Sequence, residues 1–265
     1  MHISERGVSL GNTHMKQESE SDMNLLCANS SSARTILAAA AAIACASPTM
    51  GITSFFDGVF NNSDWAVTTI TNANGTGSFV MGAQSPAGGN PNEFRRVSHA
   101  LNATGPNSLL VGVHLKANAF YNPAISGAIS SIAYSEDSIN FSSQGGNGQG
   151  TGLAILQSGR YYLLRNPILV MPYSGFSTWS PNVAGSISAS DLHEITNTGT
   201  INSASNPDFS ASGGVMQLGF WRGNSGNISY DTSCGIDNWN VRIIPAPGAL
   251  ALAGIGGLMA ARRRR

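Results

Sequence analysis

Charged side chains are scarce in this chain of 265 residues, of which 11% are Asp, Glu, Lys or Arg. Equal numbers of bases and acids, 14 of each, give a formal net charge of zero. Four of the bases close the chain as Arg262–Arg265, so acids outnumber bases between Ser47 and Ile244. No stretch of this central body concentrates positive charge, which argues against a nucleic-acid interface.

Cysteine is equally scarce, with three residues in the whole chain. Cys27 and Cys45 precede the body, which leaves Cys234 as its single cysteine and excludes an intramolecular disulfide there. The fold must therefore be held by core burial and sheet hydrogen bonds. We expect Cys234 to be a small buried hydrophobe near the start of a strand; an intermolecular bridge is the alternative.

A convincing helical period is missing from the body. Short alternating or β-branched runs are separated by Gly, Asn and Pro, a pattern typical of a β-sandwich or jelly roll. Residues 47–244 are enough to bury the core of one all-β domain. Asn74-Gly75 and Ser158-Gly159 are the expected hairpin turns, and the segment 189–196 could form a single helical turn.

Sequence motifs typical of catalytic or metal sites are also missing. His99, His114 and His193 show no metal-ligand spacing, so we expect satisfied surface or strand histidines. Glu136 and Asp137 are adjacent, so a strand would point them to opposite faces and they could not flank one glycosidic bond. No nucleophile elbow or phosphate loop is present. The sequence therefore predicts a protein without enzymatic activity.

The first 46 residues read as a leader that ends in a secretory signal peptide. Arg34 precedes a short apolar run that closes on Ala44-Cys45-Ala46, which predicts cleavage after Ala46. A start at Met23 would give a signal of ordinary length. Lipidation of Cys45 is the alternative, but Ala42 stands where a lipoprotein signal prefers Leu.

The last 21 residues, 245–265, form a three-part tail: a Pro-Ala-Pro element, an apolar run and four arginines. A spanning helix needs about 20 apolar residues. This run is shorter and contains Gly254, Gly256 and Gly257, so it would make a poor permanent anchor. The arginines would stay with anionic headgroups on the cytoplasmic side of a membrane.

This tail resembles the PEP-CTERM sorting signal of Gram-negative bacteria, with Ala246 in place of the usual middle Glu. The residues that carry the resemblance are Pro245, Ala246, Pro247, Arg262, Arg263, Arg264 and Arg265. The resemblance implies processing by an exosortase, transient inner-membrane anchoring, and a final place at the cell surface or in an exopolysaccharide matrix or biofilm. The alternative is an ordinary C-terminal anchor or a frayed apolar tail.

The body resembles concanavalin A-like lectins and laminin-G jelly rolls. The segments that carry this resemblance are FFDGVFNNSDW, LQSGRYYLL followed by Trp179, and LGFWRGNS with the closing GIDNWNVRI. This resemblance implies carbohydrate binding.

Large aromatic residues near predicted turns could serve as stacking platforms for sugars. The candidate glycan-binding residues are Tyr162, Trp179, Trp221, Arg222 and Asn224. Tyr161 and Tyr162 are consecutive, so a strand would turn one inward and the other outward. The alternative is that Trp239 and most of the other aromatic rings belong to the core.

Oxygen-bearing residues near the last strand could hold Ca²⁺, and the candidates are Asp231, Asp237 and Asn238. The alternative is that they cap turns. The sequence thus predicts an exported glycan-binding or adhesive β-sandwich. A polysaccharide hydrolase and a non-binding structural coat or biofilm protein remain alternatives. A pair of carboxylates in a groove would favour the hydrolase, and exposed aromatic rings on an open face would favour the binder.

Overall fold

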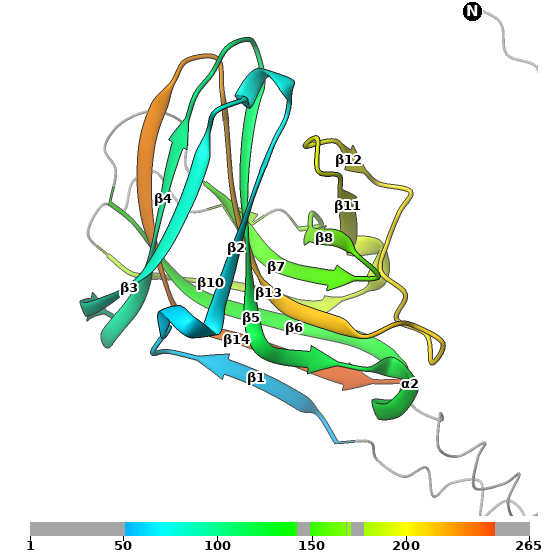
Figure 1. Cartoon of the computed structure of the whole chain (residues 1–265). Helices are drawn as coiled ribbons and strands as arrows, with labels where there is room; N and C mark the ends of the chain where they lie inside the picture. Colours follow the sequence, from blue (N-terminus) through cyan, green and yellow to red (C-terminus); the bar gives the residue numbers. More distant parts are fainter. Residues whose placement is uncertain (1–50, 142–148, 168, 171–177, 247–265) are drawn as a thin grey trace, which may run out of the picture. The chain divides into compact units, whose positions relative to one another are not determined.

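The computed structural model describes residues 51–141, 149–167, 169–170 and 178–246 (Figure 1). All of them belong to one compact unit, Ala46–Arg265. The predicted signal peptide with Ala44 and Ala46, and the tail from Pro247 onward, lie outside the described residues. None of the helices in the described ranges is long and apolar enough to cross a membrane.

Two antiparallel sheets make up the body, as expected for an all-β jelly-roll sandwich. The first sheet contains β1 (Thr53–Asp57), β3 (Phe79–Gly89), β4 (Asn92–Leu101), β6 (Ile129–Asn140), β10 (Ser180–Ile187) and β14 (Tyr230–Pro245). Its order is β10-β6-β14-β4-β3, and β1 pairs with the second half of β14. The prediction of an all-β sandwich is confirmed.

The second sheet has the order β12-β11-β8-β7-β13-β5-β2, and β9 pairs with the start of β7. Its strands are β2 (Trp65–Thr71), β5 (Ser108–Tyr121), β7 (Gly150–Gln157), β8 (Arg160–Leu164), β9 (Leu169–Val170), β11 (Leu192–Ile195), β12 (Ile201–Asn202) and β13 (Met216–Gly226). Short helical turns join some strands: η1 (Asn62–Asp64), η2 (Ala73–Gly75), α2 (Pro123–Ser126) and η3 (Ala189–Asp191). The helical turn expected over residues 189–196 is confined to η3, because Leu192–Ile195 form strand β11 instead.

One of the two predicted hairpins forms. Ser158 and Gly159 adopt positive φ angles of 52° and 77° and join β7 to β8 in the tight turn that such angles favour. The prediction at Asn74-Gly75 is wrong, because β2 pairs with β5 and β3 pairs with β4. The Asn72 side chain accepts hydrogen bonds from the amides of Gly75 and Leu109, and η2 carries the chain from one sheet to the other.

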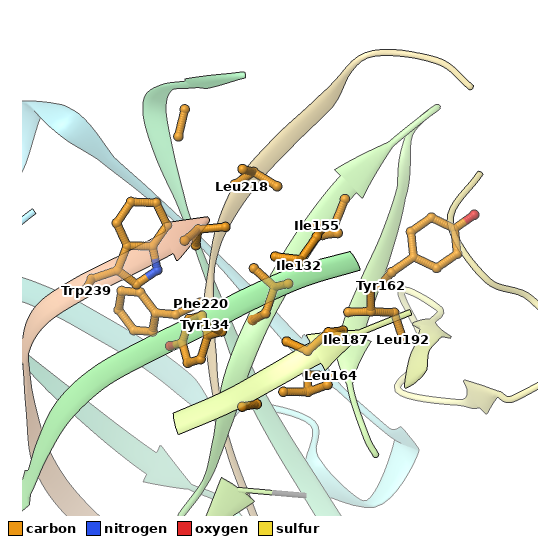
Figure 2. Packing of buried hydrophobic residues seen from close by; sticks show 14 of the residues in the cluster. Ile132, Tyr134, Ile155, Tyr162, Leu164, Ile187, Leu192, Leu218, Phe220 and Trp239 are labelled. Atoms are coloured by element: carbon orange, nitrogen blue, oxygen red, sulfur yellow. The ribbon is translucent and has the colours of Figure 1, made fainter. Parts of the chain in front are cut away.

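The main core lies between the sheets. Trp239 packs edge-to-face on Trp65 at 5.2 Å, and Trp65 packs in the same way on Phe220. Figure 2 shows Trp239, Phe220 and Tyr134 close together in this core. Cys234 is fully buried on β14, as its sequence environment predicted.

A second apolar cluster covers the opposite face of the second sheet. Val113 and Leu115 of β5 belong to it, together with Trp221 of β13 and Leu163 of β8. Three strands separate β8 from β2, yet the Tyr161 hydroxyl of β8 lies 3.1 Å from the Thr68 hydroxyl of β2. The sheet therefore curls around this cluster, and its concave face is filled by the protein's own side chains.

Candidate functional site

An aromatic platform lies on the outer face of the first sheet. It consists of Phe94 in β4, Phe141 just after β6 and Trp179 just before β10. The Phe94 ring centre lies 5.6 Å from that of Phe141 and 5.3 Å from that of Trp179. Phe94 is buried, with 4% exposure, and packs against the other two rings. Phe141 is 37% exposed and Trp179 is half-buried, so these two rings of the platform reach the surface.

The backbone of the sheet fixes the indole of Trp179. Gly235 of β14 lies beneath it, and a Cβ at that position would come within 2.7 Å of the Trp179 ring. The indole Nε1 donates a 3.0 Å hydrogen bond to the carbonyl oxygen of Gly88. The absence of a side chain at Gly235 lets the ring lie on the sheet, and the hydrogen bond sets its orientation.

Arg96 adds a positive charge to the platform. Its guanidinium lies 5.3 Å from the centre of the Phe141 ring, and its Nε donates a 2.8 Å hydrogen bond to the Ser233 hydroxyl. Arg96 is exposed, and its guanidinium lies beside the aromatic rings. A guanidinium held in this way can donate hydrogen bonds to ligand hydroxyl or carboxylate oxygens.

A network of carboxylates and amides lies on the same face, one side-chain position further along β6 and β14. Asp137 of β6 is directly opposite Asp237 of β14. The Asp137 carboxylate accepts from the side-chain amides of Asn90 and Asn238, at 3.1 and 2.8 Å. Asp237 accepts from the backbone amides of the same two asparagines. The network fixes the turn at Asn90 against the sheet.

Burial raises the pKa of Asp237, and the negative charges of Asp137 and Asp57 raise it further, whereas the two backbone hydrogen bonds lower it. Both of its oxygens are already hydrogen-bonded by the backbone. This arrangement gives Asp237 a structural role in holding the turn.

The predicted calcium site is not assembled. Asp231 and Asp237 lie six residues apart on the single extended strand β14, a separation of about 20 Å. One ion therefore cannot bind Asp231 together with Asp237 and Asn238. The prediction is wrong because these residues lie along one strand and not in a compact loop. The described part of the chain contains no cluster of three His, Cys, Asp or Glu side chains able to hold a metal.

Four of the five predicted glycan-binding residues lie in the interior. Tyr162 faces the main core and is 6% exposed, while Trp221 lies in the second apolar cluster and is 2% exposed. Tyr161 faces the opposite side from Tyr162, as expected for consecutive strand residues. Placing Trp221 at the surface was wrong because the curl of the second sheet covers its outward face.

Arg222 and Asn224 face the space between the sheets, so they cannot form the predicted glycan-binding surface. Arg222 forms a fully buried ion pair with Glu136 at 2.9 Å. Glu136 also accepts from the hydroxyls of Tyr134, Ser138 and Thr151. Glu136 is buried while Asp137 lies on the outer face, which confirms that the two adjacent acids point in opposite directions.

Two of the three body histidines are buried between the sheets. The Asn224 side-chain oxygen lies 2.6 Å from Nδ1 of His99, and burial lowers the pKa of His99 to about 4. His114 stacks on Phe220 at 4.4 Å, and burial, with the charge of Arg95 as the next cause, holds its pKa well below 6.5. Both lie on strands, as expected, but they are buried and not fully satisfied, because the Nε2 of each lacks a hydrogen-bond partner within the described ranges.

Of the predicted glycan-binding residues, Trp179 alone belongs to the platform, where Phe94, Phe141 and Arg96 join it. A strand period over residues 93–101 places Phe94 and Arg96 on one face, so the sequence did hold a signal for that pair. Nothing in the sequence indicated that Phe141 and Trp179 would lie beside Phe94.

No protein-family model and no curated protein matches the chain. A β-1,2-glucanase from Parabacteroides distasonis is similar at 10% identity and a TM-score of 0.37, over 69% of this chain and 23% of its own. An exo-β-agarase is similar at 13% identity and a TM-score of 0.37, over 72% of this chain and 26% of its own. The CBM22-1 xylan-binding domain from Paenibacillus barcinonensis Xyn10C is similar at 7% identity and a TM-score of 0.32, over 76% of this chain and 97% of its own. The chain thus spans about a quarter of the length of the two enzymes.

Proposed function

We propose that this protein is an exported glycan-binding β-sandwich. The observation that carries the proposal is the aromatic platform of Phe94, Phe141 and Trp179 on the outer face of the first sheet, with Arg96 over one of its rings. Sugars place their apolar faces on aromatic rings and their hydroxyls on nearby polar groups. The platform supplies both kinds of contact on one surface.

The polar groups around the rings favour a binder over an inert coat component. Arg96 offers donors, and the half-buried carboxylate of Asp137 offers an acceptor on the same face. Both side chains are positioned by hydrogen bonds to neighbouring residues, so little conformational freedom would be lost when a glycan binds.

The proposal assigns no catalytic step to this face. Asp137 and Asp237 lie directly opposite each other on this face. Asp237 is buried and accepts backbone hydrogen bonds through both oxygens, so it is poorly placed to protonate a leaving group.

Export and sorting remain part of the proposal on sequence grounds. A signal peptide cleaved after Ala46 would carry the chain out of the cytoplasm. The Pro245-Ala246-Pro247 element and Arg262–Arg265 would direct the chain through an exosortase to the cell surface or matrix of a Gram-negative-type bacterium. Extracellular polysaccharide is the proposed partner there.

A retention assay tests the binding proposal. Residues 47–246, which include every described strand, would be run through gels containing bacterial or algal polysaccharides. We expect one or a few glycans to retard the protein. Trp179→Ala and Phe141→Ala should weaken that binding at least about tenfold, which corresponds to about 1.4 kcal/mol.

Phe120→Ala is the matched control, since Phe120 is an exposed ring on β5 of the other sheet. It should bind like the unchanged protein, and circular dichroism should show that all variants are folded. If no glycan is retained, or if both platform variants bind as well as the control, the proposal is refuted.

A further inference from the structure

One lysine and two aspartates meet where the first strand of the body ends. Asp57 is the last residue of β1, Lys116 lies within β5, and Asp64 closes η1. Nζ of Lys116 lies 2.6 Å from Oδ2 of Asp57 and 3.7 Å from Oδ2 of Asp64. The side chains of Lys116 and Asp57 are 9% and 8% exposed, whereas that of Asp64 is 37% exposed. An amine and a carboxyl group are thus held in contact away from water, with a second carboxylate beside them.

Aromatic rings enclose this pair. Nζ of Lys116 lies 5.3 Å from the centre of the Trp65 ring, which stacks on Phe60 and packs edge-to-face on Trp239. Trp65 is 5% exposed, and the other two rings are fully buried. Removal from water favours a neutral amine and a neutral acid over the two ions, and it protects an amide product from hydrolysis. These surroundings suit a condensation between the two groups.

The two oxygens of Asp57 have different hydrogen-bond partners. Oδ1 accepts from the backbone amides of Val59 and Phe60, at 2.9 and 2.8 Å. Oδ2 accepts from Nζ of Lys116 and from the indole Nε1 of Trp65, at 2.6 and 2.9 Å. A pair of preorganised backbone donors is the arrangement that stabilises an oxyanion during acyl transfer. Oδ1 is therefore placed to carry the negative charge of a tetrahedral intermediate while Oδ2 leaves.

The pair starts as an ammonium and a carboxylate. Burial alone raises the pKa of Asp57, but hydrogen bonds from Lys116 and from the neighbouring backbone lower it overall. Reaction therefore needs one proton to pass from Nζ to Oδ2 along the 2.6 Å hydrogen bond, which leaves a neutral amine against a neutral acid. Well-oriented groups held in contact react as if at effective concentrations of roughly 10⁵–10⁸ M, and this proximity offsets the cost of the proton transfer.

We propose that Lys116 and Asp57 form an intramolecular isopeptide bond in the folded protein, with Asp64 as the proton carrier. Nζ attacks Cγ of Asp57 and forms the new C–N bond, while the C=O electron pair moves onto Oδ1. Asp64 takes a proton from the nitrogen, directly or through one water molecule, and passes it to the departing Oδ2. The C–Oδ2 bond breaks, one water molecule is released, and the Asp64 carboxylate is restored.

The bond joins the two sheets. β1 pairs with β14 in the first sheet, and the bond also fixes the end of β1 to β5 of the second. The body has a single cysteine, so an intramolecular disulfide cannot provide such a link. A covalent link between distant positions restricts the unfolded chain and so favours the folded one.

Mass spectrometry of the full chain in denaturant tests the proposal, because a covalent bond survives unfolding and an ion pair does not. The chain is made by cell-free synthesis, and its mass should be lower than the sequence mass by one water molecule. Lys116 is the single lysine of the body, so a tryptic digest should contain one branched peptide that joins its segment to that of Asp57. Lys116→Arg keeps the charge but has no nucleophilic amine, and its mass should match its sequence.

Asp64→Asn keeps the size of the proton carrier but removes its base. In samples taken over time after synthesis, the bond should form at least about 100-fold more slowly than in the unchanged protein. Glu194→Gln is the matched control, because it removes a carboxylate from the ion pair with Arg160 elsewhere on the second sheet, and it should be linked at the unchanged rate. Any of three results overturns the proposal: a full sequence mass for the unchanged protein, a loss of water that persists in Lys116→Arg, or equal rates in Asp64→Asn and the control.

Discussion

Acidification should lower the free energy of unfolding of this sandwich well above the pH at which carboxylates titrate. The pKa shift of His99 gives the size of this loss. Burial lowers its pKa from 6.5 to about 4 in the folded protein. The folded state therefore holds a neutral ring, while the unfolded chain takes up a proton below about pH 6.5. The stability that depends on the neutral His99 ring is fully present above about pH 6.5 and is lost progressively as the pH falls to about 4. One pKa unit corresponds to 1.36 kcal/mol, so the loss from this residue is about 3 kcal/mol.

Urea denaturation at several pH values between 7 and 4 measures this loss. His99→Asn keeps a side-chain donor for the Asn224 oxygen but cannot titrate, so its stability should fall less steeply over this range. His193→Asn on β11 is the control and should keep the full slope, because that residue lies outside the space between the sheets.

Comparison of variants is needed because other groups titrate nearby. Burial raises the pKa of Asp237, which opposes the histidine effect near pH 4. His114, whose pKa is also lowered by burial, adds to it. A stability that stays flat between pH 7 and 4.5, or a slope unchanged in His99→Asn, would refute the reasoning.

Two further outcomes are expected. Trp221→Ala should lower the free energy of unfolding by about 3–5 kcal/mol in urea denaturation, because it empties a buried ring site; a loss below 1 kcal/mol would contradict its place in the second cluster. Replacing Arg262–Arg265 with neutral residues should stall surface sorting in a cell fractionation while the body keeps its thermal transition; unchanged localisation would count against the sorting proposal.

Features that depend on strand alternation alone were predictable. Alternation gave the opposite orientations of Glu136 and Asp137 and of Tyr161 and Tyr162. Irregularities set the limit: β14 shifts register between Asp237 and Asn240, so a simple alternation cannot be carried through that strand. The hairpin at Asn74-Gly75 failed for a different reason, since a turn signal does not say which strands will pair.

The proposed binding surface was less predictable than the fold because it combines residues from distant segments. Phe94, Phe141 and Trp179 come together through the order of strands in the first sheet, which no local pattern encodes. The burial of Trp221 depends on the curl of the second sheet. Strand alternation correctly places the Trp221 ring on the face of the sheet away from the main core. It cannot show that the sheet curls over that face.

The curl of the second sheet also brings the turn between β11 and β12 against the end of β2. Gly199, in the turn between β11 and β12, lies so close to the end of β2 that a Cβ there would approach the Asn72 amide nitrogen to 2.8 Å. Its φ of 74° is likewise one that a larger residue adopts with strain. This close approach brings the two edges of the second sheet together and keeps the second apolar cluster away from other chains. The described part of the sheet thereby presents no exposed apolar groove on this face to other chains.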